Sequence, residues 1–173
     1  MFVFALFATS CSNDMKEIQF FDQSNTPVQS VKNADIMQSK NGNIQFKLTA
    51  PTIKKYDGET PKTEYPDGVF VEFYGSDKAV SASLSAKYAV SFDTKNIMEA
   101  RNNVVIIDYA SGDTTYMESV VWDKNEKKMY SNQPIKSVNG TRITYGDGFE
   151  SDEKFKNPQI FGQRGVLELK EDE

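Results

Sequence analysis

The sequence has no histidine and only one cysteine, Cys11, among its 173 residues. A Ser-His-Asp or Cys-His nucleophile, a histidine general base and the common zinc sites all need residue types that the chain lacks or has only once. An enzyme built from this sequence would have to use a carboxylate pair, or a metal ion held by oxygen ligands alone. We therefore expect neither catalysis nor a bound cofactor. The single cysteine also excludes an internal disulfide, so we expect a fold that is stabilised by packing.

Basic charge is also scarce: 20 Lys and Arg residues stand against 25 Asp and Glu residues, which gives a net charge of −5. The basic residues are scattered among acidic ones, whereas nucleic-acid binding needs a basic stripe that neutralises phosphates. We therefore expect no nucleic-acid partner. No segment shows a convincing helical period. A mean hydropathy of −0.57 with 12% aromatic residues is typical of alternating β-strands with one face in water.

The first ten residues form a short apolar run that ends in small residues directly before Cys11. Residues 8–11, Ala-Thr-Ser-Cys, resemble a bacterial lipobox, in which the cysteine is lipidated and becomes the first residue of the mature protein. The alternative is a buried strand with a packed, unmodified cysteine. We favour lipidation because the cysteine is solitary and polar residues follow it at once. No Lys or Arg precedes the apolar run, so we also expect the natural chain to start a few residues upstream.

Three regions follow from this interpretation of the amino-terminal end. Residues 1–10 would be a signal peptide, too short to span a bilayer, which needs about 20 apolar residues in a helix. Residues 11–33 would be the lipidated end and a mostly polar tether that lifts the domain from the membrane surface. Residues 34–170 would form a single all-β domain, since a chain of this length is ordinarily one domain.

An aromatic residue followed by aspartate recurs along this domain. The pairs are Tyr56-Asp57, Phe92-Asp93 and Trp122-Asp123, with a degraded copy at Ser151-Asp152. They are spaced by roughly 30 residues, and in each of the first three copies an apolar run begins roughly 12 residues further on. The sequence therefore predicts one hairpin-like unit that is stacked four times. Aspartate at the start of each turn is expected to cap the turn's backbone and not to bind a metal ion.

Alternation of apolar and polar residues with a period of two predicts antiparallel strands through most of the domain. One long strand is expected over residues 80–93, and another, apolar on both faces, over residues 96–109. Proline and glycine within residues 51–66 predict an irregular connection. Asn-Gly pairs at 41–42 and 139–140 predict tight hairpin turns. The other expected strands cover residues 28–37, 44–48, 68–74, 114–123, 129–131, 142–145 with Phe149, 159–161 and 166–169, and Gly146-Asp147-Gly148 is expected to form a flexible corner.

Apolar side chains on successive units would line one continuous surface of the sheet. In most β proteins such a surface is a closed core, whereas in an open sheet it can form a ligand-binding groove. The pattern alone leaves both possibilities open, although large side chains favour a groove. These large residues are Phe46, Phe73, Tyr88, Phe92, Met117 and Trp122.

Two repeats, over residues 86–104 and 119–135, are followed by Gly146-Asp-Gly-Phe149 and Asn157-Pro-Gln-Ile160. These segments resemble the OstA-like repeats of the LptC family of periplasmic lipopolysaccharide-export proteins. The same repeat occurs in the bridge protein LptA and in the amino-terminal domain of LptD. The resemblance covers roughly residues 34–166. An anchor followed by one domain of this length favours LptC among the three, although members of that family often have a transmembrane helix where this chain has Cys11.

The resemblance implies a twisted, open antiparallel β-jellyroll that holds the acyl chains of lipopolysaccharide in its apolar interior. Such a protein, anchored to the inner membrane on its periplasmic side, receives lipid from an inner-membrane ABC transporter. It passes the lipid to an LptA-like bridge protein through paired edge strands (β-augmentation) and performs no chemical step. The residues expected to bind lipid are Phe46, Leu48, Val69, Val71, Phe73, Leu84, Tyr88, Val104, Ile106 and Met117.

Two other functions are compatible with the sequence. A structural adaptor would use its apolar faces as an ordinary closed core and would join envelope proteins only through its edge strands. An enzyme with a carboxylate pair or an oxygen-liganded metal would need acidic residues that gather in a cleft.

Overall fold

The computed structural model describes residues 26–153, 155 and 157–168, and in this part of the chain every regular element is a β-strand. Fourteen strands join into one sheet in which every pairing is antiparallel. The expected fold class, an antiparallel β-jellyroll, is confirmed. The strands are β1 (Gln29–Lys40), β2 (Asn43–Tyr56), β3 (Lys62–Tyr65), β4 (Val69–Tyr74), β5 (Val80–Ala86), β6 (Tyr88–Phe92), β7 (Ile97–Asp108), β8 (Thr114–Asp123), β9 (Lys128–Ser131), β10 (Ile135–Asn139), β11 (Arg142–Gly146), β12 (Gly148–Asp152), β13 (Gln159–Phe161) and β14 (Val166–Glu168).

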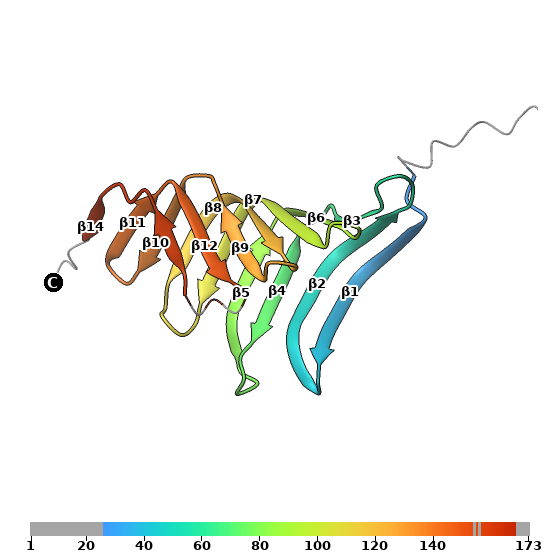
Figure 1. Ribbon diagram of the computed structural model, residues 1–173, viewed down its shortest axis with the longest axis horizontal. Coiled ribbons are helices and arrows are strands. Elements are labelled where there is room, and N and C mark those ends of the chain that lie inside the picture. The colour runs from blue at the N-terminus through green and yellow to red at the C-terminus, as the bar shows by residue number, and fades with distance from the viewer. Residues whose placement is uncertain (1–25, 154, 156, 169–173) are drawn as a thin grey trace, which may run out of the picture.

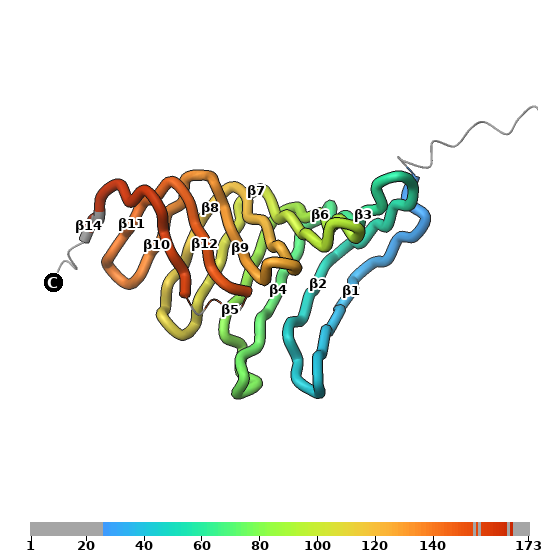
Figure 2. Tube along the Cα trace, in the orientation of Figure 1, coloured from blue at the N-terminus to red at the C-terminus, as the bar shows by residue number. Residues whose placement is uncertain are grey.

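The sheet folds over on itself into an elongated body of two layers, with β1 near one end and β14 at the other (Figures 1 and 2). This is possible because β2, β7 and β8 are long enough to pair with different neighbours along their two halves. Layer A consists of residues 43–50 of β2, β4, β5, residues 104–108 of β7, residues 114–117 of β8, β10, β11 and β14. Layer B consists of residues 53–56 of β2, β3, β6, residues 97–101 of β7, residues 119–123 of β8, β9, β12 and β13.

The long strands bend where they pass from one layer to the other, along a line that we call the crease. In β7 the bend is a β-bulge, in which Asn102 and Asn103 together face a single residue of β8, Glu118. Both asparagines have positive φ angles, 64° and 56°, which asparagine tolerates better than most residues. The backbone N–H of Lys87 donates to the carbonyl oxygen of Asn102 (3.0 Å), so the corner between β5 and β6 is fixed to the bulge.

The expectation of one strand over residues 80–93 is wrong, because the chain turns a corner at Lys87. Before the corner, β5 pairs with β4 and β7 in layer A; after it, β6 pairs with β3 and β7 in layer B. The flexible corner that the sequence predicts at Gly146-Asp147-Gly148 is confirmed, since it separates β11 from β12. The corner at Lys87, by contrast, does not interrupt the alternation of apolar and polar residues enough to be seen in the sequence.

The irregular connection expected over residues 51–66 is also wrong in part, since β2 continues through Pro51 to Tyr56. Proline has no N–H to donate and is tolerated in a strand only where no ladder bond is needed. Pro51 lies between the part of β2 that pairs with β4, which ends at Thr49, and the part that pairs with β3, which begins at Lys54. On its other side the β1 ladder is interrupted at Asn33.

Opposite the crease, the two layers face each other across a long opening that we call the mouth. One rim belongs to layer A and consists of the tips of the hairpins β1–β2, β4–β5 and β7–β8, which point to the same side in Figure 1. The other rim belongs to layer B and consists of residues 93–96 and 124–127 together with Phe155. Asp123 begins one of these turns, and its Oδ1 accepts hydrogen bonds from the backbone N–H groups of Asn125 (2.9 Å) and Glu126 (3.1 Å). The capping role expected of the aspartate is therefore confirmed at Asp123.

Candidate functional site

The residues predicted to line the interior lie, with one exception, on the inner face of layer A. Leu48, Val71, Leu84 and Ile106 are direct cross-strand neighbours in one row over β2, β4, β5 and β7. Because the whole set is buried in a single cluster, it forms a continuous apolar surface across layer A. The set brought together is Phe46, Leu48, Val69, Val71, Phe73, Leu84, Val104, Ile106 and Met117.

Tyr88 is the exception, because its side chain lies on the outer face of layer B. The alternation that points the apolar side chains of β5 inward shifts by one residue at Lys87, and Ala89 takes the inner position. Tyr88 is opposite Arg101 on β7, and burial, followed by the charge of Glu64, raises the pKa of its hydroxyl. The structure thus places Tyr88 in the charged outer surface and away from the other predicted residues.

Layer B supplies the opposite wall of the interior, and Trp122 on β8 makes its main contacts with layer A. The Trp122 ring meets the rings of Phe46 and Phe73 edge-on, with ring centroids 5.2 Å and 5.5 Å apart. Phe155 meets Phe73 in the same way at 5.2 Å. Edge-on contacts of this kind add to the free energy gained by burying the rings. The other buried apolar residues of this wall are Ile53, Tyr65, Ala89, Met98, Ala100, Val120, Met129 and Phe149.

Sequence reasoning identifies little of this second wall. Trp122 stands out as a large apolar residue, but the sequence does not say that it faces Phe46. Phe155 lies alone in a charged stretch with no alternating neighbours, so no local signal marks it. Ala89 and Ala100 are small, and their inward positions depend on where the strands cross between layers.

Three cavities lie between the rims of the mouth. The first, about 250 Å³, lies at the β1–β2 end over Phe46, Phe73 and Trp122. The second, about 620 Å³, lies between the tips of β4–β5 and β7–β8 and Phe155. The third, about 410 Å³, lies towards β11 and shares Phe155 and Asp108 with the second. The packed aromatic interior is therefore flanked by open space at several points of the mouth.

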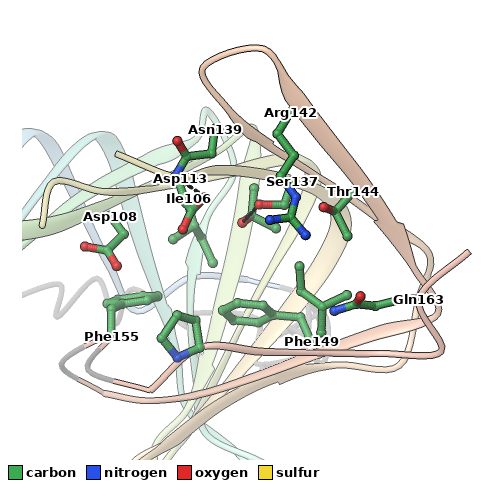
Figure 3. Close-up of a pocket in the computed structure, with 13 residues that line it drawn as sticks. Ile106, Asp108, Asp113, Ser137, Asn139, Arg142, Thr144, Phe149, Phe155 and Gln163 are labelled. Atoms are coloured by element: carbon green, nitrogen blue, oxygen red, sulfur yellow. Dashed lines mark hydrogen bonds between the residues drawn. The ribbon is translucent and has the colours of Figure 1, made fainter. Parts of the chain in front are cut away.

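The third cavity has walls of opposite polarity (Figure 3). Ser137, Thr144 and the guanidinium of Arg142 lie on the layer A side, and the rings of Phe149 and Phe155 lie across from them. Pockets of roughly 300–1,000 Å³ with an apolar lining and a few polar groups are typical of small-molecule sites. This cavity suits a ligand that has one polar and one apolar side.

The carboxylates at this cavity hold the neighbouring turns. Asp108 Oδ1 accepts hydrogen bonds from the backbone N–H groups of Ala110 (2.9 Å) and Ser111 (3.4 Å). Asp113 Oδ1 accepts one from the Asn139 side-chain amide (2.9 Å). Among the described residues, no three or more His, Cys, Asp or Glu side chains are placed to hold a metal ion.

Positive charge gathers at the first cavity, where Lys40, Lys124 and Lys127 line the opening. The Lys124 ammonium lies 5.0 Å from the centroid of the Trp122 ring, a cation–π distance. Burial lowers the pKa of Lys124, and the nearby carboxylate of Asp93 opposes this shift.

Both ends of the molecule have sheet edges without a neighbour in the described part of the chain. At one end β1 pairs only with β2; at the other, β14 pairs only with β11 and β13 only with β12. Strand β1 has 12 residues, of which all but one are exposed. A long exposed edge readily pairs with another strand, so these ends are candidate sites for strand addition.

Cys11 and the expected signal peptide lie outside the residues that the structure describes. Within those residues, no helix has the length and apolar character that crossing a bilayer requires.

Comparison with known proteins gives one informative result. A family model described as "Lipopolysaccharide-assembly, LptC-related" matches residues 1–168. No curated protein matches the chain. The matched residues include all strands from β1 to β14, and with them the interior, the mouth and both sheet edges.

Proposed function

Because the chain belongs to the LptC-related family of lipopolysaccharide-assembly proteins, we propose that it binds lipopolysaccharide in the periplasm and relays it from an inner-membrane ABC transporter to an LptA-like bridge. As a member of this family, the protein is a component of lipopolysaccharide transport in the cell envelope. The relay, the binding site and the partners are the proposed steps.

The observation that carries the proposal is the apolar interior with its opening along one side of the molecule. Each CH₂ group removed from water contributes about 0.8 kcal/mol, so an acyl chain of a dozen carbons costs on the order of 10 kcal/mol to hold in water. A carrier must therefore enclose the chains while it leaves the polar sugars outside. An apolar surface between two layers, with a mouth along its length, meets both needs.

The way the layers are joined supports entry of lipid through the mouth. Strand pairing joins them through the crease, whereas the aromatic contacts in the interior link side chains: Phe46 with Trp122 and Phe73 with Trp122 and Phe155. Separation of the rims would break these side-chain contacts and no strand pairing. Acyl chains would replace the contacts with others of the same apolar kind, so the exchange would cost little free energy.

The unpaired edges support the proposed partners. Pairing of β1 with a strand of one neighbour, and of β14 or β13 with a strand of another, would extend both layers into proteins of the same fold. The apolar interiors would then join end to end. Lipid could move along the assembly without contact with water.

We also propose that the protein is held at the inner membrane by a lipid on Cys11, on the basis of the residues that precede it. Substitution Cys11→Ser removes the single cysteine. In cells fed with radioactive palmitate, the wild-type protein is expected to be labelled and to sediment with membranes, and the variant is expected to do neither. An unlabelled wild-type protein would exclude a lipid anchor.

Site-specific photocrosslinking tests the lipid-binding proposal. A photo-reactive phenylalanine analogue placed at Phe73 or Phe155, inside the mouth, is expected to form adducts with lipopolysaccharide. The matched control is the same analogue at Tyr130, which follows the inward-facing Met129 on β9 and so lies on the outer face. Adducts at the two inner positions but not at Tyr130 would support the proposal.

A structural adaptor that pairs edge strands without binding lipid is the alternative. It predicts that the inner positions give no lipid adduct while the protein still assembles with its envelope partners. Adducts that are as frequent at Tyr130 as at Phe73 would also contradict lipid binding between the layers.

A further inference from the structure

The first cavity of the mouth combines an apolar floor with a positively charged rim. Its floor is formed by the rings of Phe46, Phe73 and Trp122. Its rim carries Lys40 on the layer A side. On the layer B side it carries Lys124 and Lys127, from the turn between β8 and β9. Among the described residues, Glu153 is the only acidic one that lines the cavity, in a protein whose net charge is −5. The rim of this cavity is therefore positively charged although the chain as a whole is negatively charged.

Among the described residues, none of these three lysines forms an ion pair within 4.0 Å, although the carboxylate of Asp93 is near enough to Lys124 to affect its pKa. Other lysines on the strands are paired, as Lys62 is with Glu64 (2.7 Å) and Lys128 with Glu150 (3.0 Å). Lys124 is the least exposed of the three: it is partly withdrawn from water, its ammonium lies over the face of the Trp122 ring, and the charge of Asp93 offsets only part of the effect of burial on its pKa. A buried ammonium without an acceptor is stabilised when an anion approaches it.

Two further features of the same cavity concern Trp122 and Lys127. The indole N–H of Trp122 is buried and has no hydrogen-bond acceptor among the described residues, and the Trp122 side chain is more than nine-tenths buried. Lys127 has a φ angle of 54°, in the left-handed region that favours glycine or asparagine. In the adjacent β6–β7 turn, the corresponding position is held by Asn96 (φ 56°). The positive φ angle is thus common to both turns, and it places Lys127 at the rim, where its backbone carbonyl accepts a hydrogen bond from the N–H of Glu153 (3.1 Å). The unsatisfied indole N–H is the feature that indicates a ligand.

We infer that Lys40, Lys124 and Lys127 form a binding site for the phosphate group of an amphiphile whose acyl chain lies on Phe46, Phe73 and Trp122. This inference rests on the proposed function and specifies it further: the protein would select phosphorylated lipids, and would hold the phosphate at the β1–β2 end of the mouth. The third cavity differs, because Asp108 and Asp113 line it along with Arg142. The anionic group is therefore expected at the first cavity.

The chain contains a single tryptophan, so its fluorescence reports on this cavity directly. Three probes are titrated below their micelle concentrations: dodecyl phosphate, uncharged dodecyl maltoside and inorganic phosphate. The rim variant carries Lys40→Gln, Lys124→Gln and Lys127→Gln. The control variant carries Lys55→Gln, Lys87→Gln and Lys136→Gln, which give the same net charge but lie elsewhere, and circular dichroism checks that both variants fold.

Wild-type protein is expected to bind dodecyl phosphate more tightly than dodecyl maltoside. The rim variant should lose on the order of tenfold in affinity for dodecyl phosphate, since hydrogen bonds to charged groups are stronger than neutral ones, and should bind the maltoside unchanged. The control variant should behave as the wild type. Inorganic phosphate alone should bind far more weakly than dodecyl phosphate, because it lacks the acyl chain.

Three results would overturn the inference. Equal affinity of the wild type for the two amphiphiles would show that the phosphate is not recognised. An equal loss in the control variant would show an effect of overall charge. Binding of inorganic phosphate as tight as that of dodecyl phosphate would show a site for a free anion. If neither amphiphile bound at all, the proposed lipid-binding function would fail together with this inference, whereas binding without preference would contradict the inference alone.

Discussion

At the scale of single residues, Trp122 links stability and the candidate site. Its ring packs edge-on against the rings of Phe46 and Phe73 in the interior and is part of the floor of the first cavity. The ammonium of Lys124 lies over the face of the same ring. The same ring has a buried N–H with no hydrogen-bond partner among the residues that the structure describes. Trp122 is therefore held by packing, while its polar atom is not satisfied within that part of the chain.

Substitutions of Trp122 separate these two properties. Trp122→Ala removes a large ring from the core and is expected to lower the free energy of unfolding by about 3–5 kcal/mol. Trp122→Phe keeps an aromatic ring and removes the unpaired donor, so a loss of about 1 kcal/mol or less is expected. Urea unfolding followed by circular dichroism measures both. Equal losses in the two variants would contradict the assignment of an unsatisfied N–H.

Lys124 is predicted to reduce stability at neutral pH. Burial places its folded-state pKa below the ordinary value of 10.5. Between these two values the unfolded chain binds more protons than the folded chain, so stability rises with pH in that window. Lys124→Met should therefore make the protein more stable at pH 7, and its advantage over the wild type should shrink as the pH approaches 10.5.

Urea unfolding at several pH values checks this prediction, with Lys87→Met as the control at an exposed lysine. A destabilised Lys124→Met variant, or an advantage that does not change with pH, would contradict it. The same substitution removes one of the proposed phosphate ligands, so gain in stability and loss of phosphate binding are expected together.

At the scale of elements, the bulge in β7 allows one strand to belong to both layers. Asn103 is exposed and has a positive φ angle, so a change of its side chain tests the backbone without disturbing the core. Asn103→Val is expected to cost about 1–3 kcal/mol, because a β-branched residue is strained in the left-handed region. Asn103→Gly should be nearly neutral. Urea denaturation measures the free energy of unfolding of both variants. An Asn103→Val variant as stable as the wild type would show that the bulge is not required.

The strands that stay within the expected pattern could be predicted from sequence, as could the corner marked by Gly146 and Gly148, but the corner at Lys87 could not. The alternation over β8 and the uninterrupted apolar run in β7 identify these strands closely. The same alternation continues through Lys87, where no glycine or proline marks the corner. A period of two gives the face of a strand but not the layer to which it belongs.

The residues of the candidate site could likewise be predicted only where a strand stays within one layer. The inner face of layer A was accessible to prediction because its residues lie on strands that keep one phase, as Leu48, Val71 and Leu84 do. Tyr88 was assigned to the wrong face because it follows the corner. Phe155 and the lysines of the first cavity come together only through the folding of one layer over the other.

At the scale of the whole molecule, the buried apolar residues form one cluster between the two layers. The outer face of layer B carries ion pairs between neighbouring residues, such as Lys62 with Glu64. Ion pairs of this kind contribute little to stability, but they keep that face in water. The unpaired edges lie at the two ends of the space between the layers. An apolar interior with an unpaired sheet edge at each end is suited to a protein that forms one segment of a longer lipid channel.

The most direct test asks whether lipopolysaccharide enters the space between the layers. A fatty acid with a nitroxide on its acyl chain is bound to the protein, where it is expected to quench the fluorescence of Trp122. A Trp122→Phe, Tyr130→Trp variant, whose only tryptophan lies on the outer face, should not be quenched. Excess lipopolysaccharide should displace the fatty acid and restore the emission of Trp122. If lipopolysaccharide binds the protein but leaves the quenching unchanged, it does not occupy the interior, and the proposed function is contradicted.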